Sequence, residues 1–292
     1  MSESPDLSGK TCVVTGASSG IGKVTAAALA EMGARTVLVC RDPARGEAAR
    51  AEIAQRSGSG EVDLLIADVS SQRQVRQLAA DINGRYDRLD VLVNNAGAMN
   101  TTRTLTEDGI ETTFAVNHLA YFLLTDLLLD MLKAGDGGRI VSVSSRAHVG
   151  SRINFDDIGG EQRFSGYRIY GQSKLANVLF TYELARRLDG SGVSANCLHP
   201  GVVATGFGHN NSDLFGRTFG VVLGAIRPFI LSPERGAETS IYLASSPEVA
   251  GVSGKYFSSK KAIKSSPETY DEAAAQRLWR FSEDLTKPSA TV

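Results

Sequence analysis

Short apolar runs and longer helical segments follow one another along the chain. The short runs are rich in Val, Leu and Ile, and we expect strands at residues 11–15, 36–40, 62–67, 89–93, 139–143, 193–198 and 255–257. The intervening segments are Ala- and Glu-rich or repeat apolar residues at helical spacing, and we expect helices at residues 23–30, 44–55, 71–82, 110–132 and 170–188. Ser71 and Gln74 form a candidate capping box at the start of the third helix.

This alternation predicts an α/β fold. Apolar strands separated by helices form a parallel sheet that is covered on both faces. Right-handed crossovers then give a doubly wound, three-layer arrangement, here of about seven strands. We expect one domain over residues 1–292, with a core at 8–258 and a C-terminal helix and tail at 259–292. Ligands of such folds bind at the carboxyl ends of the strands, so the residues after each strand are the candidates for a site.

Composition and charge narrow the class of protein. With 31 basic and 32 acidic residues, the formal net charge is −1, which gives no reason to expect nucleic-acid binding. Cys12, Cys40 and Cys197 lie in apolar β-like runs without ligand spacing, so we expect buried small hydrophobes and a reducing, cytoplasmic location. Residues 1–6 are polar and acidic, and we expect neither a signal peptide nor an N-terminal membrane anchor there.

The first strand leads into a glycine-rich turn and then a helix. The unpaired N–H groups and positive dipole end of such a helix suit a phosphate, and glycines allow close approach of the backbone. The alternative is a tight turn of any α/β protein. The predicted phosphate-binding residues are Gly16, Ser18, Ser19, Gly20, Ile21 and Gly22.

The end of the second strand bears on which dinucleotide would bind. An acidic residue near this position binds the ribose 2′-OH of NAD, whereas an Arg accommodates the 2′-phosphate of NADP. Cys40 and Arg41 stand here, which favours NADP(H) over NAD(H), although Asp42 follows directly. Lys23 could add to the positive field. The alternative is that Arg41 is a solvated loop charge.

The third and fourth strands are followed by residues that suit the rest of a dinucleotide. Asp68, before Val69, could accept a hydrogen bond from an adenine amino group, or could form a turn before Ser70. Small residues after the fourth strand would let a flat cofactor lie against the backbone, although they also suit a tight exit from a strand. They are Asn94, Asn95, Ala96 and Gly97.

Ser144 and Ser145 follow the fifth strand, and a Tyr–Lys pair opens the next long helix. Tyr170 and Lys174 are spaced i, i+4, so their side chains share one helix face. An ammonium near a phenol lowers the phenol pKa from about 10 towards neutrality, and such a Tyr can transfer a proton near pH 7. By itself the pair is also typical of a half-exposed helix face.

Taken in order, these motifs closely resemble the short-chain dehydrogenase/reductase family from about residue 10 to residue 256. The combination is far more specific than any one motif. The best fit is to the retinol dehydrogenase-like branch, and the fold implied is of the Rossmann type. The segments that carry this fit are Cys40-Arg41-Asp42, Val116-Asn117-His118-Leu119, Ser173-Lys174-Leu175-Ala176-Asn177, Glu183 to Leu188, His199-Pro200-Gly201, Gly236 to Ser240 and Arg277-Leu278-Trp279.

The resemblance implies hydride transfer between a nicotinamide cofactor and a carbonyl or alcohol. Tyr170 would be the general acid in reduction and the base in oxidation. Lys174 would lower its pKa and hold the nicotinamide ribose. Ser145, the second of the serine pair, would bind the substrate oxygen, and Asn117 would support a proton-relay water. The residues implied to line the nicotinamide and its phosphates after the sixth strand are Pro200, Gly201, Val203 and Thr205.

Residues 202–235 are the expected substrate lid. Their apolar content suits a small hydrophobic aldehyde, ketone or alcohol. Two alternatives remain, packing on the core and contact with a membrane surface as an amphipathic helix. Arg217 and Arg227 argue against a membrane-spanning helix.

The chain departs from most of the family between Ser145 and Tyr170, where an insertion leaves both monomer and homodimer open. We expect the membrane-anchoring N-terminal helix of many relatives to be missing here, and therefore a soluble relative rather than a peripheral retinoid or lipid dehydrogenase. A non-catalytic nucleotide-sensing protein would be expected to lack part of the Ser, Tyr and Lys set, which is complete here. Double-bond reduction is also possible on this scaffold. The four histidines show no metal-ligand spacing, and ordinary packing is expected of them: His118, His148, His199 and His209.

Overall fold

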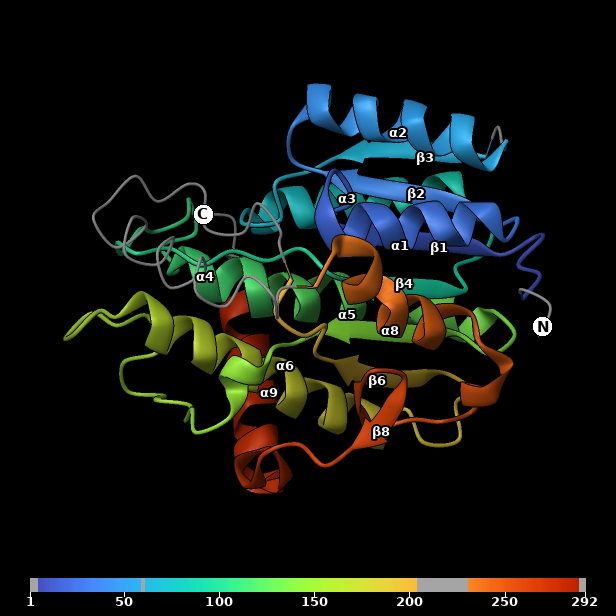
Figure 1. Cartoon of the computed structure of the whole chain (residues 1–292). Helices are drawn as coiled ribbons and strands as arrows, with labels where there is room; N and C mark the ends of the chain where they lie inside the picture. Colours follow the sequence, from blue (N-terminus) through green and yellow to red (C-terminus); the bar gives the residue numbers. More distant parts are fainter. Residues whose placement is uncertain (1–4, 59–60, 204–230, 289–292) are drawn as a thin grey trace.

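The computed structural model describes residues 5–58, 61–203 and 231–288, and in these ranges an eight-stranded sheet forms the centre of the molecule (Figure 1). The strand order is β3-β2-β1-β4-β5-β6-β7-β8, with parallel pairing from β3 to β7. The order reverses between β1 and β4, which is where doubly wound sheets bind ligands. The strands are β1 (Thr11–Thr15), β2 (Arg35–Cys40), β3 (Val62–Ile66), β4 (Val91–Asn94), β5 (Arg139–Val143), β6 (Ser194–Leu198), β7 (Tyr256–Ser258) and β8 (Lys261–Ile263).

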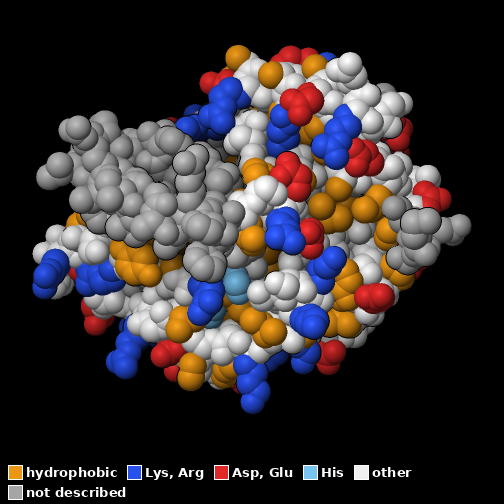
Figure 2. All heavy atoms as spheres, viewed as in Figure 1, with side chains coloured by type: hydrophobic (Ala, Val, Ile, Leu, Met, Phe, Trp, Pro, Cys, Tyr) orange, Lys and Arg blue, Asp and Glu red, His pale blue; other side chains and the backbone are white. Residues whose placement is uncertain are grey.

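Helices cover both faces of the sheet, as the sequence predicts. On one face α1 packs against α2 and α8; on the other, α3 packs against α5, and α6 against α9 (Figure 1). The helices are α1 (Gly20–Glu31), α2 (Pro43–Ser57), α3 (Gln72–Arg85), α4 (Thr112–Phe114), α5 (Ala120–Ala134), α6 (Gly166–Arg187), α8 (Pro233–Ser245) and α9 (Glu272–Thr286). On the face in Figure 2, basic and acidic side chains are interspersed.

The eighth strand was not predicted. β8 pairs antiparallel with β7, and all three of its residues are exposed, so no apolar alternation marks it. Ser259 and Lys260 form the connecting turn with φ of 49° and 62°. Hairpin turns with positive φ at both central positions usually contain Asn and Gly. The dipeptide Ser259-Lys260 therefore gives no sequence signal for a hairpin.

Two helices differ from their predicted form. Helix α6 begins at Gly166 with Ser165 as its cap, so Tyr170 lies one turn inside the helix rather than at its start. The predicted helix at 110–132 is α4 and α5 joined by a π-helical turn, Ala115–Leu119. By length and composition residues 112–134 could cross a membrane, but 78% of the apolar 18-residue window within this stretch is buried inside the protein. Packing in the core therefore explains its apolar character.

His118 lies in this π turn and is fully buried, as expected of a packing residue. Its ring contacts Phe114 and Phe180, and its Nε2 lies 2.9 Å from Ser282 Oγ of α9. Burial lowers the pKa of His118 to about 3. The buried neutral ring therefore makes its full contribution to the free energy of unfolding at pH values above about 6.5, the ordinary pKa of His in the unfolded chain. This contribution is lost as the pH falls from about 6.5 towards the folded-state pKa.

We therefore expect acid to destabilise the protein before its carboxylates titrate. Between pH 7 and pH 5 the cost at His118 is about 2 kcal/mol, since 1.5 pH units below 6.5 correspond to roughly that free energy. Urea unfolding at both pH values measures it. His118→Phe should lose less stability over this interval than the wild type, and an equal loss in both proteins would contradict the assignment.

Candidate active site

The turn between β1 and α1 is built for close contact between main chains. Gly16 has φ of 68°, and a Cβ placed there would lie 2.9 Å from Ala96 Cα. A Cβ on Gly22 would lie 2.4 Å from Gly16 O and from Asn95 Nδ2. Gly20 also takes positive φ, at 56°. The three glycines thus let the turn fold tightly against the residues that follow β4.

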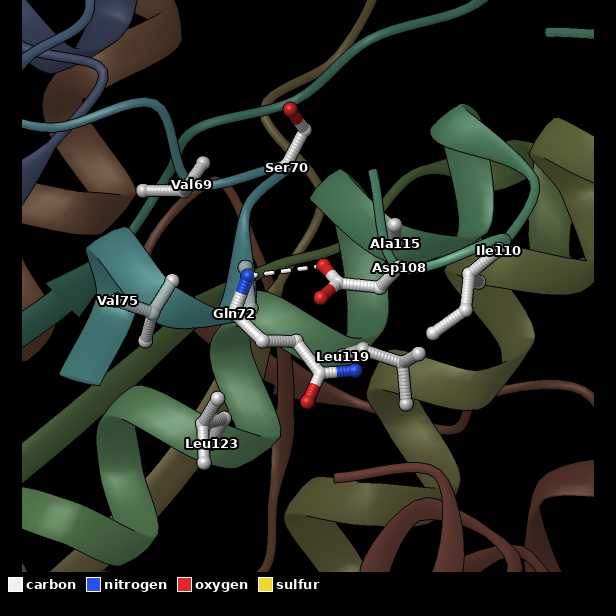
Figure 3. A pocket seen from close by; sticks show the side chains of 10 residues that line it. Val69, Ser70, Gln72, Val75, Asp108, Ile110, Ala115, Leu119 and Leu123 are labelled. Carbon is white, nitrogen blue, oxygen red and sulfur yellow. Dashed lines mark hydrogen bonds between the residues drawn. The ribbon is translucent and has the colours of Figure 1, made fainter. Parts of the chain in front are cut away.

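Helix α1 begins in a way that leaves its first amides for an anion. Among the described residues, its cap Ser19 makes no side-chain capping bond, and its first turn contains no acidic residue. Helix α3 is the contrast. There the side chain of Ser71 caps the amide of Gln74, and Asp108 Oδ2 accepts from Gln72 N at 3.0 Å (Figure 3). The start of α3 therefore already holds a carboxylate of this chain, whereas that of α1 suits a phosphate.

Thr15, at the end of β1, joins the turn to the β4 exit. Its Oγ1 accepts from Asn95 N at 2.9 Å and from Ala96 N at 3.1 Å. Asn95 Nδ2 donates to Thr15 O at 2.8 Å. Thr15 was not among the predicted site residues, although its position directly before Gly16 was the available signal. The structure brings Asn95 and Ala96 against the glycine turn, with Gly97 next in the chain, and their contact with a cofactor stays a prediction.

At the end of β2, Cys40 is buried and Arg41 is exposed. Asp42 caps α2 by accepting from Arg45 N at 2.8 Å, so its carboxylate is directed to the helix. Lys23 is ion-paired with Glu52 at 2.5 Å, which offsets the positive field expected from it. Arg41 is therefore the basic residue of the predicted set that remains for a 2′-phosphate.

Asp68 forms the turn that was considered as its alternative role. Its Oδ1 accepts from Ser70 N at 2.9 Å, and its own amide donates to Gln74 Oε1 at 3.0 Å. In a reciprocal capping box the Gln74 side chain would accept a hydrogen bond from Ser71 N. Here it accepts from Asp68 N instead. Val69 lies over a small pocket between α3 and the π turn (Figure 3). Contact of Asp68 and Val69 with adenine stays a prediction.

Ser145, Tyr170 and Lys174 come together at the carboxyl end of β5. The side chain of Ser145 interacts with the phenol of Tyr170 and acts to lower its pKa. Lys174 Nζ donates to Val143 O at 3.0 Å and lies 5.7 Å from the centroid of the Tyr170 ring. Ser144 is buried and donates its hydroxyl to Lys174 O at 2.8 Å. Ser144 thus supports the helix, and Ser145 is the serine beside Tyr170; binding of the substrate oxygen by Ser145 stays a prediction.

The protonation of this cluster differs from the prediction. Burial raises the pKa of Tyr170 to about 12, and the hydrogen bond with Ser145 only partly opposes this. Burial also lowers the pKa of Lys174 to about 7. The expected lowering of the Tyr170 pKa by Lys174 is therefore not found in the protein alone, because both groups are buried and desolvation disfavours both charged forms.

Asn117 lies in the π turn with its side chain fully bonded. Its Oδ1 accepts from Ala98 N at 2.7 Å, and its Nδ2 donates to Ala98 O and to Ser173 Oγ, each at 2.9 Å. Ser173 Oγ in turn donates to Tyr170 O at 2.7 Å. Asn117 thus ties the β4 exit to the helix that bears Tyr170. The predicted support of a relay water would have to use its main chain.

Tyr121 is a site residue that the sequence reading missed. Its hydroxyl donates to Ala96 O at 2.8 Å, and the centroid of its ring lies 5.7 Å from Lys174 Nζ. Burial raises the pKa of Tyr121 well above its ordinary value, so it remains a neutral donor. Its spacing i, i+4 from Asn117 was the only sequence signal.

The loop after β6 carries the last predicted residues. Gly201 has φ of 87°, and its amide donates to His199 Nδ1 at 3.1 Å, directly after Pro200. Val203 forms a bridge with Leu231. Thr205 and most of the expected lid at 202–235 lie outside the described residues.

Three comparisons agree with this geometry. The short chain dehydrogenase family model matches residues 10–213. Human retinol dehydrogenase 14 is 47% identical over 292 residues, covering 95% of this chain and 86% of its own. An uncharacterized protein of Mycobacterium paratuberculosis has a solved structure with a TM-score of 0.77, 34% identity and coverage of 97% and 96% of the two chains. The NADP active-site complex of Pseudomonas aeruginosa RhlG gives a TM-score of 0.69 at 26% identity, covering 86% and 95%.

Proposed function

The chain belongs to the short-chain dehydrogenase/reductase family, in its retinol dehydrogenase-like branch, and on that premise we propose that it reduces a hydrophobic aldehyde or ketone with NADPH. The observation that carries the proposal is that Ser145, Tyr170 and Lys174 meet at the carboxyl end of β5, with Lys174 Nζ 5.7 Å from the centroid of the Tyr170 ring. This cluster lies at the same edge of the sheet as the uncapped start of α1.

The residues present fit a nicotinamide dinucleotide. Gly16 and Gly22 let the turn between β1 and α1 fold tightly against the β4 exit, and the amides of α1 would hold the pyrophosphate. When bound, the cofactor supplies or accepts the hydride. Lys174 would hold the nicotinamide ribose. Main-chain groups of Asn95 and Gly201 would lie beside the cofactor.

Ser145 would bind the substrate oxygen, and Tyr170 would protonate it. Ser145 donates a hydrogen bond to the carbonyl oxygen and holds it beside the phenol. Tyr170 then gives its proton to this oxygen as an alcohol forms. A pKa of about 12 keeps Tyr170 protonated near pH 7, which is the form that reduction needs.

The cofactor and substrate parts of the proposal have separate support. For NADP(H), Arg41 is exposed at the end of β2, and the Asp42 carboxylate caps α2. RhlG, which has the same fold, was solved with NADP. For a hydrophobic substrate, the relative of similar sequence is named for retinol, and residues 202–235 are apolar in sequence. We also propose a cytoplasmic location, which suits three buried thiols.

A panel of carbonyls tests the proposal. Nonanal, followed at 340 nm, and all-trans-retinal, followed by chromatography of retinol, should be reduced with NADPH at least about tenfold more efficiently than with NADH. Arg41→Ala should remove most of this preference, because a charge-assisted contact with phosphate contributes roughly 1.5 to 3 kcal/mol. Arg50→Ala removes the same charge from a guanidinium that is bonded to Glu47, and should change nothing. If NADH serves as well as NADPH, the role of Arg41 is wrong while the reaction class stands.

A further inference from the structure

Two histidines and a tyrosine stand behind the candidate active site, and the proposed reaction does not use them. His148 follows β5, His199 follows β6, and Tyr256 begins β7. These three strands are neighbours in the sheet. The Tyr256 ring contacts both imidazoles, with centroid distances of 5.0 Å to His148 and 5.8 Å to His199.

His148 bonds the main chain of Ser145. Its Nδ1 lies 2.6 Å from Ser145 O, and its Nε2 accepts from Ser266 N at 3.3 Å. A main-chain N–H can only donate, so Nε2 is unprotonated and Nδ1 carries the proton that it donates to Ser145 O. The side chain is 1% exposed, and burial lowers its pKa, which keeps it in this neutral form.

His199 bonds the main chain of the loop after β6 in the opposite sense. Its Nδ1 accepts from Gly201 N at 3.1 Å and is therefore unprotonated. Burial lowers the pKa of His199 to about 4, so the ring is neutral near pH 7. Its own amide donates to Phe257 O, next to Tyr256, at 3.1 Å. Each imidazole is thus bonded to one loop of the site and packed on the same phenol ring.

We propose that His148, Tyr256 and His199 form a brace that positions Ser145 and Gly201 relative to each other. The proposal rests on the proposed function, which assigns Ser145 to the substrate oxygen and Gly201 to the cofactor. Through Ser145 O, His148 sets where the Ser145 hydroxyl lies beside Tyr170. Through Gly201 N, His199 fixes the start of the loop that faces the nicotinamide. All three are positioning residues, since His148 and His199 bond main chain and the Tyr256 hydroxyl lies 3.4 Å from His148 Nδ1.

Matched variants separate positioning from simple support of the fold. His148→Asn places an amide donor where Nδ1 was and keeps the bond to Ser145 O. His148→Gln instead places its amide where Nε2 was and keeps only the contact with Ser266. With nonanal and NADPH, we expect kcat of the Asn variant within about threefold of wild type and kcat of the Gln variant about tenfold lower, with KM little changed. Thermal unfolding should shift equally in both.

The second arm reads cofactor binding without turnover. His199→Asn keeps an acceptor for Gly201 N, whereas His199→Leu does not. Titration of NADPH fluorescence should give a Kd near that of wild type for Asn and about tenfold weaker for Leu. Equal kcat in the two His148 variants, or equal Kd in the two His199 variants, overturns the brace. Absence of turnover by the wild type on every carbonyl would count against the proposed function instead, and the binding arm would still test His199.

Discussion

Replacing Tyr170 with Phe should lower kcat for nonanal reduction by roughly a thousandfold, because general acid catalysis by a positioned group contributes about 10² to 10⁴. The change removes one oxygen from a partly buried side chain and leaves the ring beside Lys174 in place. NADPH binding should therefore be nearly unchanged. Steady-state turnover followed at 340 nm measures kcat, and a fluorescence titration of NADPH measures its Kd.

Tyr167→Phe is the matched control for this variant. Tyr167 lies one turn earlier on α6 and is 66% exposed, so the loss of its hydroxyl should leave kcat within about twofold of wild type. Turnover by Tyr170→Phe above a tenth of the wild-type value would remove Tyr170 from the role of proton donor. Equal losses in both variants would point to a general disturbance of α6.

Residues whose role follows from backbone conformation or from spacing could be predicted from the sequence. Gly16, Gly20 and Gly22 are needed because no side chain fits the turn or its positive φ, and this requirement is visible in the residue type. Tyr170 and Lys174 share a helix face at any reasonable choice of helix boundaries, so the error in the start of α6 did not displace them.

Properties set by burial and by tertiary bonds could not be predicted. The pKa of Tyr170 was expected to fall, but the sequence does not show that Lys174 is buried and that desolvation opposes the charged forms of both groups. The π turn around Asn117 has no periodic signature, because it shifts the helix register by one residue. Tyr121 looked like one more apolar position in a core helix, and only the fold brings its hydroxyl to Ala96.

Helix α9 was expected only as a C-terminal helix, yet it supports the helix that bears the catalytic pair. Trp279 is 8% exposed and stacks on Phe180 of α6 with 5.8 Å between ring centroids. It meets Phe122 of α5 edge-on at 5.0 Å, and the Arg187 guanidinium lies 4.1 Å from the centroid of its ring. Its Nε1 donates to Glu283 at 2.8 Å. One side chain thus joins three helices.

Trp279→Ala should therefore destabilise the protein by about 3 to 5 kcal/mol, the usual cost of removing a buried aromatic ring. For a chain of this size that corresponds to a fall in Tm of roughly 5 to 15 °C, which calorimetry or circular dichroism measures. Trp279→Phe keeps a ring against Phe180 and loses only the bond to Glu283 and part of the packing, so it should cost less than half as much. A fall of less than 2 °C for the Ala variant would show that α9 adds little support. Loss of turnover by Trp279→Ala at temperatures well below its Tm would show that α9 also holds Tyr170 in place. This follows because α6 carries both Tyr170 and the residues that contact Trp279.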